Sequence, residues 1–404
     1  MSWQEIAKKY DLDISVIELS EVIEINRLDA EFYKPEHLIT DKFLKSKKYF
    51  MLNKNEVVSG PFGSTLKSEE YIEKGVRLIR VQDIKQRYFL DKELAVFISE
   101  ESNNKIKNSE LKTGDLVVSK VGNTIGLIAH IDEELKRANV SENNIGIKLD
   151  SYSESAKYTI LAFLNSKYGQ SQILRRISGN AQPKLNVFNF TEIIIPIVSA
   201  KLQDEIAKII KSAYELRISS EKSYSQAEQL LLTELGLADY VPNEANTSIR
   251  DLFECLQDDR FDAEYWMPKY DEMQKRVAKV PQKKLGQIVS YKKGIEVGSE
   301  AYQEEGENFI RVSDFSIYGI EGVEKKISSE LYENLKMNYQ PKKGEVLFTK
   351  DGTIGLSYAL DEDIKGILSG AFLRLQPKTN INLHYLALVL NSLYCKYQIG
   401  RAHV

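Results

Sequence analysis

The sequence RLDAEFYKP at residues 27–35 recurs as RFDAEYWMP at residues 260–268. Most of the nine positions keep the same residue or its aromatic or hydrophobic character. Self-similarity at this distance bears on the architecture of the whole chain. It predicts that one structural unit occurs twice.

The match continues in the same order along both halves. IRVQDI at 79–84 corresponds to IRVSDF at 310–315, and LNS at 164–166 corresponds to LNS at 390–392. The block GDLVVSKVGNTIG at 114–126 recurs as GEVLFTKDGTIG, with Asn123 as one extra residue. Collinear matches of this kind indicate a duplication. The stretches between them differ, which favours one scaffold with two different recognition surfaces over two equivalent functions.

Composition places the chain among globular proteins with room for two domains. It has 404 residues, of which 42% are hydrophobic and 28% charged. No apolar run suggests a membrane span, and the start MSWQE carries no secretory signal pattern. The two cysteines, Cys255 and Cys395, lie far apart, which favours a reduced, cytoplasmic location. The net charge of −4 argues mildly against nucleic-acid binding, although a local basic surface suffices for it.

Within one repeat the local patterns predict both strands and helices. Short β-branched runs predict strands at 78–81, 115–120 and 193–196. The glycines at 60–64 and 122–126 predict turns that need positive φ. Apolar spacing predicts a helix over residues 158–174.

A long helix is predicted between the two repeats. Ser199 can cap its start, and Gly236 is a natural stop. Steps of four and three residues place apolar side chains on one seam, as in a coiled coil, with a weak stretch at Ser220 and Ser223. We expect a spacer that docks on another long helix, and a plain linker helix is the alternative. The predicted partner contacts are Leu202, Ile206, Ile209, Ala213, Leu216 and Leu230.

Motifs for catalysis are missing from the sequence. There is no Gly-x-x-x-x-Gly-Lys-Ser/Thr phosphate loop and no Asn-Pro-Pro-Tyr-type motif of amino-methyltransferases. The four histidines are isolated in sequence and the two cysteines are separated, which argues against a zinc site. We therefore expect neither a catalytic nor a metal site in this chain.

In this order and in duplicate, the motifs resemble those of the specificity (S) subunit of type I restriction–modification enzymes. The resemblance extends over nearly the whole chain. It is carried by GPFGSTLK at 60–67, IRVQDI at 79–84, the glycine-rich block at 114–126, SGNAQ at 178–182 before Ile195-Pro196, and LQDEI at 202–206.

The resemblance implies an α+β fold, in which two repeated target-recognition domains of mixed β-sheet and helices are joined by a long coiled-coil-like helix. The expected boundaries are 1–198, 199–236 and 237–404. Each domain would read one half of a bipartite site in double-stranded DNA, and the helix would set the spacer. Two methylase (M) subunits for adenine methylation and motor-nuclease (R) subunits for restriction are the implied partners. S-adenosylmethionine, ATP and Mg²⁺ would belong to these partners, and the chain itself would be non-catalytic.

The second repeat departs from the pattern at its end. Val404 aligns with Ser178, whereas the first repeat continues to Leu237. We therefore expect a truncated second domain. Two other functions stay open at this point. One is a scaffold protein that binds only protein, which the acidic balance favours, and the other is the recognition subunit of a type II-like restriction enzyme.

The candidate DNA contacts are cations, amides and hydroxyls at repeated positions or near turns. Arg80 and Arg311 could grip a guanine edge or a phosphate, or instead pair with Asp83 or Asp314, which would need a bend in the strand. The other cations could reach phosphate or be ordinary solvated side chains. The predicted set is Lys67, Arg80, Gln82, Lys120, Asn123, Thr124, Arg175, Arg176, Gln182, Lys184, Lys293, Arg311, Ser313, Lys350, Thr353 and Arg401.

The opening motif itself is expected to be structural. Arg27 and Asp29, repeated as Arg260 and Asp262, are predicted to form a buried or capping pair at the entrance of each repeat. Its aromatic residues, Phe32, Tyr33, Tyr265 and Trp266, are predicted to lie in the core rather than to stack on bases.

Overall fold

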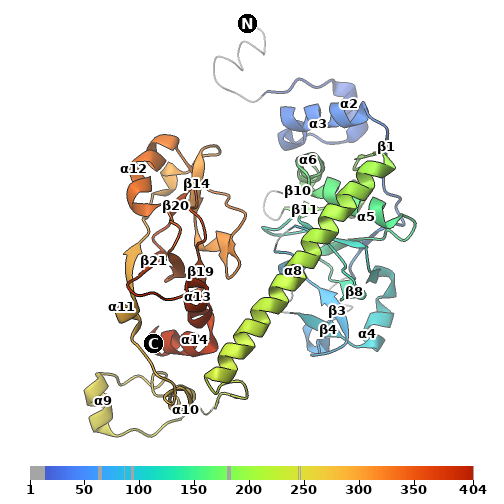
Figure 1. Ribbon diagram of the computed structural model, residues 1–404. Coiled ribbons are helices and arrows are strands. Elements are labelled where there is room, and N and C mark those ends of the chain that lie inside the picture. The colour runs from blue at the N-terminus through green and yellow to red at the C-terminus, as the bar shows by residue number, and fades with distance from the viewer. Residues whose placement is uncertain are drawn as a thin grey trace. The chain divides into compact units, whose positions relative to one another are not determined.

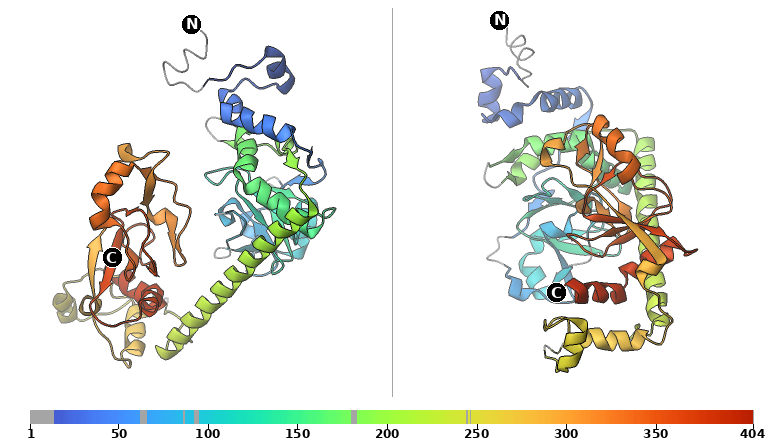
Figure 2. Two further views of the ribbon diagram at one scale, coloured as in Figure 1. Left: turned by 45° about the horizontal axis from the view of Figure 1, so that its top comes forward. Right: turned by 90° about the vertical axis from the view of Figure 1, so that its left-hand side faces the viewer.

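The structure is a computed structural model that describes residues 14–61, 66–85, 87–91, 95–179, 183–243, 245 and 247–403 (Figure 1). The chain divides into two compact units, Met1–Leu216 and Arg217–Val404. The helix α8, Ala200–Glu234, continues without a break from the first unit into the second (Figure 2). No helix in these ranges is long and apolar enough to cross a membrane.

The described part of the first unit contains two four-stranded sheets. One is antiparallel and has the order β2 (Val57–Ser59), β9 (Asn144–Ile147), β6 (Leu116–Ser119), β7 (Ile128–His130). The other has the order β4 (Val96–Ile98), β3 (Val76–Ile79), β8 (Arg137–Val140), β5 (Leu111–Lys112), and its β3–β8 pair is parallel. Two short antiparallel pairs join β1 (Tyr49–Phe50) to β12 (Ile195–Pro196) and β10 (Ile177–Ser178) to β11 (Lys184–Leu185).

The second unit repeats this plan. Its antiparallel sheet has the order β13 (Val289–Lys293), β21 (Phe372–Pro377), β18 (Val346–Thr349), β19 (Ser357–Ala359). Its second sheet has the order β17 (Lys326–Ile327), β14 (Glu307–Ile310), β20 (Ile367–Leu368), again with one parallel pair, β14–β20. A short hairpin joins β15 (Phe315–Ser316) and β16 (Gly319–Ile320). The duplication read from the sequence is therefore also a duplication of strand order.

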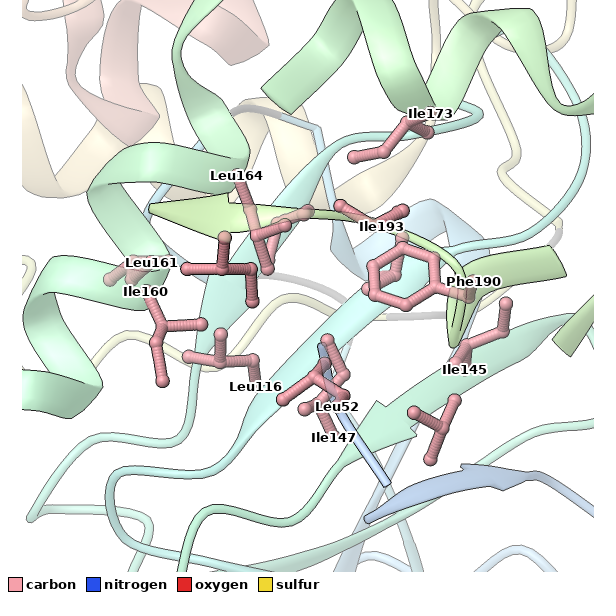
Figure 3. Packing of buried hydrophobic residues seen from close by; sticks show 14 of the residues in the cluster. Leu52, Leu116, Ile145, Ile147, Ile160, Leu161, Leu164, Ile173, Phe190 and Ile193 are labelled. Atoms are coloured by element: carbon pink, nitrogen blue, oxygen red, sulfur yellow. The ribbon is translucent and has the colours of Figure 1, made fainter. Parts of the chain in front are cut away.

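Strand β6 shows why these runs form buried strands. Leu116 and Val118 belong to one hydrophobic cluster, and Val117 between them belongs to another. Successive side chains of a strand point to opposite faces, so both faces of β6 are covered and its sequence is continuously apolar. Figure 3 shows Leu116 in the first cluster, facing Leu161 and Leu164 of a helix.

The described residues of both units also form helices. In the first unit they are α2 (Leu19–Ile25), α3 (Pro35–Lys45), α4 (Glu100–Lys105), α5 (Glu154–Asn165), α6 (Lys167–Arg175) and α7 (Val187–Phe190). In the second they are α9 (Leu252–Asp258), α10 (Pro268–Val277), α11 (Leu285–Ile288), α12 (Ser329–Tyr339), α13 (Leu383–Asn391) and α14 (Leu393–His403). The short 3₁₀ turns are η1 (Ala30–Tyr33), η2 (Ser68–Glu70), η3 (Val81–Asp83), η4 (Lys107–Ser109), η5 (Ser299–Ala301) and η6 (Val312–Asp314).

The single helix predicted over 158–174 is wrong, because the chain forms two helices there, α5 and α6. Ser166 is extended between them, with ψ of 165°, and its hydroxyl accepts from the N–H of Gly169 as the cap of α6. Only a glycine fits at 169, since a Cβ would lie 2.3 Å from the carbonyl oxygen of Phe163. Ser392 caps α14 after α13 in the same way.

The long helix α8 begins and ends as the sequence predicts. The N–H of Leu202 reaches the Ser199 hydroxyl at 3.4 Å. Gly236, with φ of 68°, ends the helix, and the N–H of Leu237 donates to the carbonyl of Leu232 at 2.7 Å. In the first unit Tyr214 of α8 stacks on Phe89, with ring centroids 5.9 Å apart.

The motif that opens each repeat is structural. Arg27 makes two hydrogen bonds to Asp29, of 2.8 and 2.7 Å, and also donates to the carbonyl of Ile177 at 3.1 Å. Arg260 and Asp262 form the same two-bond pair, at 2.6 and 2.8 Å. Phe32, Tyr33 and Trp266 are buried and Tyr265 is half-buried. The predicted pairing and the core role of the aromatic residues are confirmed, but the prediction that the pair is buried is wrong for the first unit, because Asp29 is 44% exposed.

Candidate nucleic-acid interface

Arg80 and Arg311 occupy the same position in the two units, where a strand ends and a 3₁₀ turn begins. The backbone N–H of Arg80 donates to Asp83 Oδ2 at 2.8 Å, and its Nη2 lies 3.4 Å from Oδ1. The corresponding distances between Arg311 and Asp314 are 2.9 and 3.4 Å. The bend that an ion pair requires is present in both units. The ion-pair interpretation is therefore confirmed for both arginines.

The side chains of both arginines nevertheless stay partly exposed to solvent. The Arg80 side chain is 22% exposed and that of Arg311 is 30% exposed, whereas the aspartates are buried. A further arginine, which the sequence did not single out, holds the first aspartate from inside. Arg77 is 5% exposed, with Nη2 at 3.5 Å from Asp83 Oδ2, and burial lowers its pKa against the pull of that carboxylate. The turn thus presents Arg80 in one fixed place.

Lys120 and Lys350 both follow a strand, but their surroundings differ. Lys120 Nζ is 3.4 Å from the Ser59 hydroxyl and 3.4 Å from the carbonyl of Glu142. Burial is the main cause that lowers the pKa of Lys120, and nearby Lys184 adds to the effect. Lys350 instead pairs with Asp351 beside it in sequence. The two equivalent lysines therefore have different polar neighbours.

The glycine turn predicted at 122–126 is confirmed in geometry, and its repeat at 352–355 has the same form. The prediction of positive φ is wrong for Gly60, which is needed instead because it passes close to the backbone of Ser141, and Gly63 lies outside the described residues. Gly122 and Gly352 have φ of 79° and 70°, in the region that favours glycine. Asn123 and Thr353 are exposed on these turns. Thr124 is half-buried, and its hydroxyl lies 2.9 Å from that of Ser119. Of the three predicted polar contacts here, Asn123 and Thr353 are the more accessible.

Arg175 and Arg176 are not the surface cluster that the sequence suggested. Arg175 is 4% exposed, lies 3.9 Å above the ring of Phe32 and is 3.4 Å from Asp41. Arg176 is 6% exposed and donates to the carbonyl of Gln172 at 3.0 Å. Both side chains stabilise the interior, where DNA has no access to them. We therefore withdraw them as DNA contacts.

Arg401 has the place in the second unit that Arg175 has in the first. It lies 4.2 Å above the ring of Tyr265 and 3.5 Å from Asp271, with 17% of its side chain exposed. The repeat thus places an arginine on the aromatic pair of its opening motif in both units. Because its side chain is partly exposed, Arg401 stays a predicted DNA contact.

Six predicted contacts remain. Five of them are exposed, and one lies outside the described residues. Gln182 falls in the stretch 180–182 and is not described. The exposed residues are Lys67, Gln82, Lys184, Lys293 and Ser313.

A cavity of about 290 Å³ brings two of the predicted residues together with a loop that the sequence did not single out. Arg80 and Gln82 line it from η3, and Ser141, Glu142 and Asn143 line it from the loop after β8. The two segments meet because β3 and β8 pair in parallel, so their ends lie side by side. That pairing joins residues about sixty apart in sequence, and no local pattern reveals it.

The predicted partner-binding residues of α8 differ in exposure. Leu202, Ile209, Leu216 and Leu230 are 42%, 69%, 71% and 64% exposed. Ala213 is exposed as well, and Ile206 is half-buried. The heptad-spaced positions therefore form an exposed apolar stripe along α8 within this chain.

Metal ligands do not gather in the part of the chain that the structure describes. It holds no group of three or more His, Cys, Asp and Glu side chains placed to bind a metal ion. His37 and His130 are buried and separate, and His130 donates through Nδ1 to the carbonyl oxygen of Tyr88 at 2.9 Å.

The chain belongs to the family of type I restriction modification DNA specificity domains. The family model matches residues 13–229 and 279–402, one region in each half of the chain. This assignment also matches the class of protein that the repeated motifs suggested, a restriction–modification specificity subunit with two target-recognition domains. No curated protein sequence matches the chain.

Among solved structures, the chain is similar to the S subunit of a type I restriction–modification system from M. genitalium. The identity is 15%, the match covers 88% of this chain and 80% of that one, and the TM-score is 0.37. For the HsdS subunit from Thermoanaerobacter tengcongensis the identity is 14%, the coverage 86% and 80%, and the TM-score 0.27. For the type IIG restriction endonuclease BpuSI they are 9%, 48% and 30%, and 0.33. The family assignment rests on the family model alone.

Proposed function

We propose that this chain is the DNA specificity subunit of a type I restriction–modification complex, and that each unit reads one part of a bipartite duplex target. The observation that carries the proposal is the repeated arginine–aspartate turn. Arg80 with Asp83 and Arg311 with Asp314 have the same geometry to within 0.1 Å in their hydrogen bonds. Two domains that recognise different DNA sequences would need the same backbone arrangement in both, with different side chains around it.

Exposed cations around this frame would supply affinity through DNA phosphates. Lys67 and Lys184 are exposed in the first unit and Lys293 in the second. Each phosphate that a cation neutralises releases counterions, so binding should weaken steeply with salt. The overall charge of −4 does not oppose this role, because phosphate contact depends on the local surface.

Catalysis would come from partner subunits. The exposed apolar stripe of α8 is the surface we propose for methylase subunits, two of them in the arrangement implied by the family. These would methylate adenine, and motor-nuclease subunits would restrict unmodified DNA. S-adenosylmethionine, ATP and Mg²⁺ would bind to the partners.

The proposal can be tested by competition binding. The full chain with its methylase partner is first used to select duplexes from a pool of random sequence, and the selected duplex then competes with unselected DNA. We expect a bipartite preference and binding that falls as salt rises. Equal binding to selected and unselected duplexes would contradict the proposal. No binding even at low salt would favour a scaffold that contacts only protein, the reading that the acidic charge supports.

A further inference from the structure

The cavity beside Arg80 has a counterpart frame in the second unit, because the same backbone contacts build both corners. The N–H of Ser141 donates to the carbonyl of Ile79 at 2.9 Å, and the N–H of Ser369 donates to the carbonyl of Ile310 at 2.9 Å. These bonds place the loop 141–143 and the loop 369–371 at equivalent positions, directly after the parallel strand.

Two further contacts fix the register of the two loops. The N–H of Lys120 donates to the carbonyl of Asn143 at 3.0 Å, and the N–H of Lys350 donates to that of Ala371 at 2.8 Å. Gly60 and Gly294 each pass so close to the loop that an added Cβ would lie 2.0 Å from a serine carbonyl oxygen, that of Ser141 or Ser369. Residues 142 and 143 therefore correspond to 370 and 371.

The side chains on this shared frame differ at three adjacent positions. The residue two places after the arginine is Gln82 in the first unit and Ser313 in the second. The loop carries Glu142 and Asn143 in the first unit and a glycine and an alanine in the second. At these three positions the first unit carries polar side chains with an amide or a carboxylate, and the second unit carries small residues.

In the second unit another side chain takes up the space left by the small residues. A Cβ at Gly370 would lie 2.4 Å from Glu296 Oε1, so the carboxylate of Glu296 rests where the side chain of residue 142 begins in the first unit. The same corner is therefore filled from a different segment, the loop that follows β13. This exchange changes which groups the surface presents and leaves the backbone unchanged.

The chemistry of the three residues suits base edges better than phosphates. Glu142 is exposed on the cavity rim, and a carboxylate repels phosphate but accepts from the amino group of cytosine. Gln82, also exposed, and half-buried Asn143 carry amides, which can bond both the acceptor and the donor of an adenine edge. Arg80 between them adds a donor for guanine or the backbone.

We propose that Gln82, Glu142 and Asn143 are the residues with which the first unit distinguishes bases in its part of the target. The equivalent positions of the second unit, with Glu296 beside them, present a different surface and so read a different sequence. This inference rests on the proposed DNA-reading function and deepens it. The arginine–aspartate turn and the lysine after the strand, Lys120 or Lys350, occur in both units and would position the DNA.

The test is selection from a random duplex pool with the full chain and its methylase partner. The variant Gln82→Ser/Glu142→Gly/Asn143→Ala gives the first unit the residues of the second at these three places. We expect base preference to fall about tenfold or more at positions within one part of the bipartite motif. The other part, which the second unit reads, should stay unchanged and serves as an internal control.

Two further variants keep the outcome decisive. Glu142→Gln alone changes one charge with little change in shape, and it should alter preference at a position of the same part and leave affinity for unselected DNA equal or higher. Glu101→Gln/Asn104→Ala, on exposed positions of α4 in the same unit, should select the wild-type motif. If the triple variant and Glu142→Gln both select the wild-type motif, the inference is overturned and the proposed function stands. If wild type selects no motif, both fall.

Discussion

At the scale of single residues, burial separates arginines that the sequence could not tell apart. Arg80 and Arg175 both lie near motifs of the repeat, yet only Arg80 reaches the surface. Arg175 is enclosed between the ring of Phe32 and the carboxylate of Asp41. A guanidinium in that position contributes to packing rather than to recognition.

Arg175→Ala should therefore lower the stability of the fold, whereas Lys184→Ala should weaken DNA binding. Loss of Arg175 removes a buried cation–aromatic contact and should lower the free energy of unfolding by about 2 kcal/mol. Lys184 is exposed, so its removal should leave stability unchanged and reduce the slope of log affinity against log salt by about 0.9 if it contacts a phosphate. Denaturant melts and salt titrations of DNA binding measure the two effects. An unaltered salt slope for Lys184→Ala would remove it from the interface.

Asp83→Ala should be strongly destabilising. The carboxylate is 2% exposed and holds the guanidinium groups of Arg77 and Arg80, so its removal leaves Arg77 buried with an uncompensated charge. Breaking a buried pair in this way costs about 3 kcal/mol or more. The matched control is Asp150→Ala, because Asp150 is 64% exposed and 3.9 Å from Lys112, where a loss below about 1 kcal/mol is expected. Equal melting of the two variants would refute the anchoring role of Asp83.

At the scale of elements, capping residues in the sequence predicted where the long helix begins and ends, but the apolar spacing did not predict where a helix is interrupted. Ser199 and Gly236 marked the ends of α8 correctly, because capping chemistry is local. The break at Ser166 was missed, since the apolar spacing continues through α5 and α6. The break depends on Gly169 packing against the backbone of the preceding helix, which is a tertiary contact.

The packing of α8 on the first unit should depend on pH through His130. Burial is the main cause that lowers the pKa of His130 below its ordinary 6.5, while the Tyr88 carbonyl and Asp132 act in the other direction. The ring also contacts Phe89, Tyr158 and Tyr214 of α8. With a lowered pKa in the folded state, the unfolded chain binds more protons, so stability is present above pH 6.5 and is lost as pH falls below it.

We therefore expect the first unit to unfold at lower denaturant concentration at pH 5 than at pH 7.5. His130→Gln should reduce this difference, and the remainder is expected from His37, whose pKa burial also lowers. His384→Gln is the control, because His384 is 64% exposed. A pH dependence that is the same in wild type and His130→Gln would contradict this account.

The apolar stripe of α8 should matter for partner binding and not for folding. Ile209→Asp and Leu216→Asp change side chains that are 69% and 71% exposed, so melting should shift by less than about 0.5 kcal/mol. Co-purification with the methylase partner should be lost, because a carboxylate would be buried without a partner at the contact. Lys222→Asp, at an exposed position about 140° around the helix from Ile209 and about 120° from Leu216, should bind the methylase normally. Normal binding by the stripe variants would locate the partner surface elsewhere.

At the scale of the whole molecule, the repeat carried most of what could be predicted. The repeat indicated two equivalent units, the family resemblance implied their α+β fold, and capping and apolar spacing predicted the long helix; the strand orders of the two units and α8 agree with this. The loop with Glu142 and Asn143 could not be predicted. It reaches Arg80 only through the parallel pairing of β3 and β8, and an acidic residue is not one that a search for DNA contacts selects.

The central claim is that two units built on one frame read two parts of one DNA target. It is tested most directly by mapping methylated adenines across the genome of a host that expresses the full chain with its methylase partner. We predict one modified motif with two specified parts separated by an unspecified spacer. The variant Gln82→Ser/Glu142→Gly/Asn143→Ala should alter only one of the parts. A single contiguous motif, or no modified motif at all, would contradict the account.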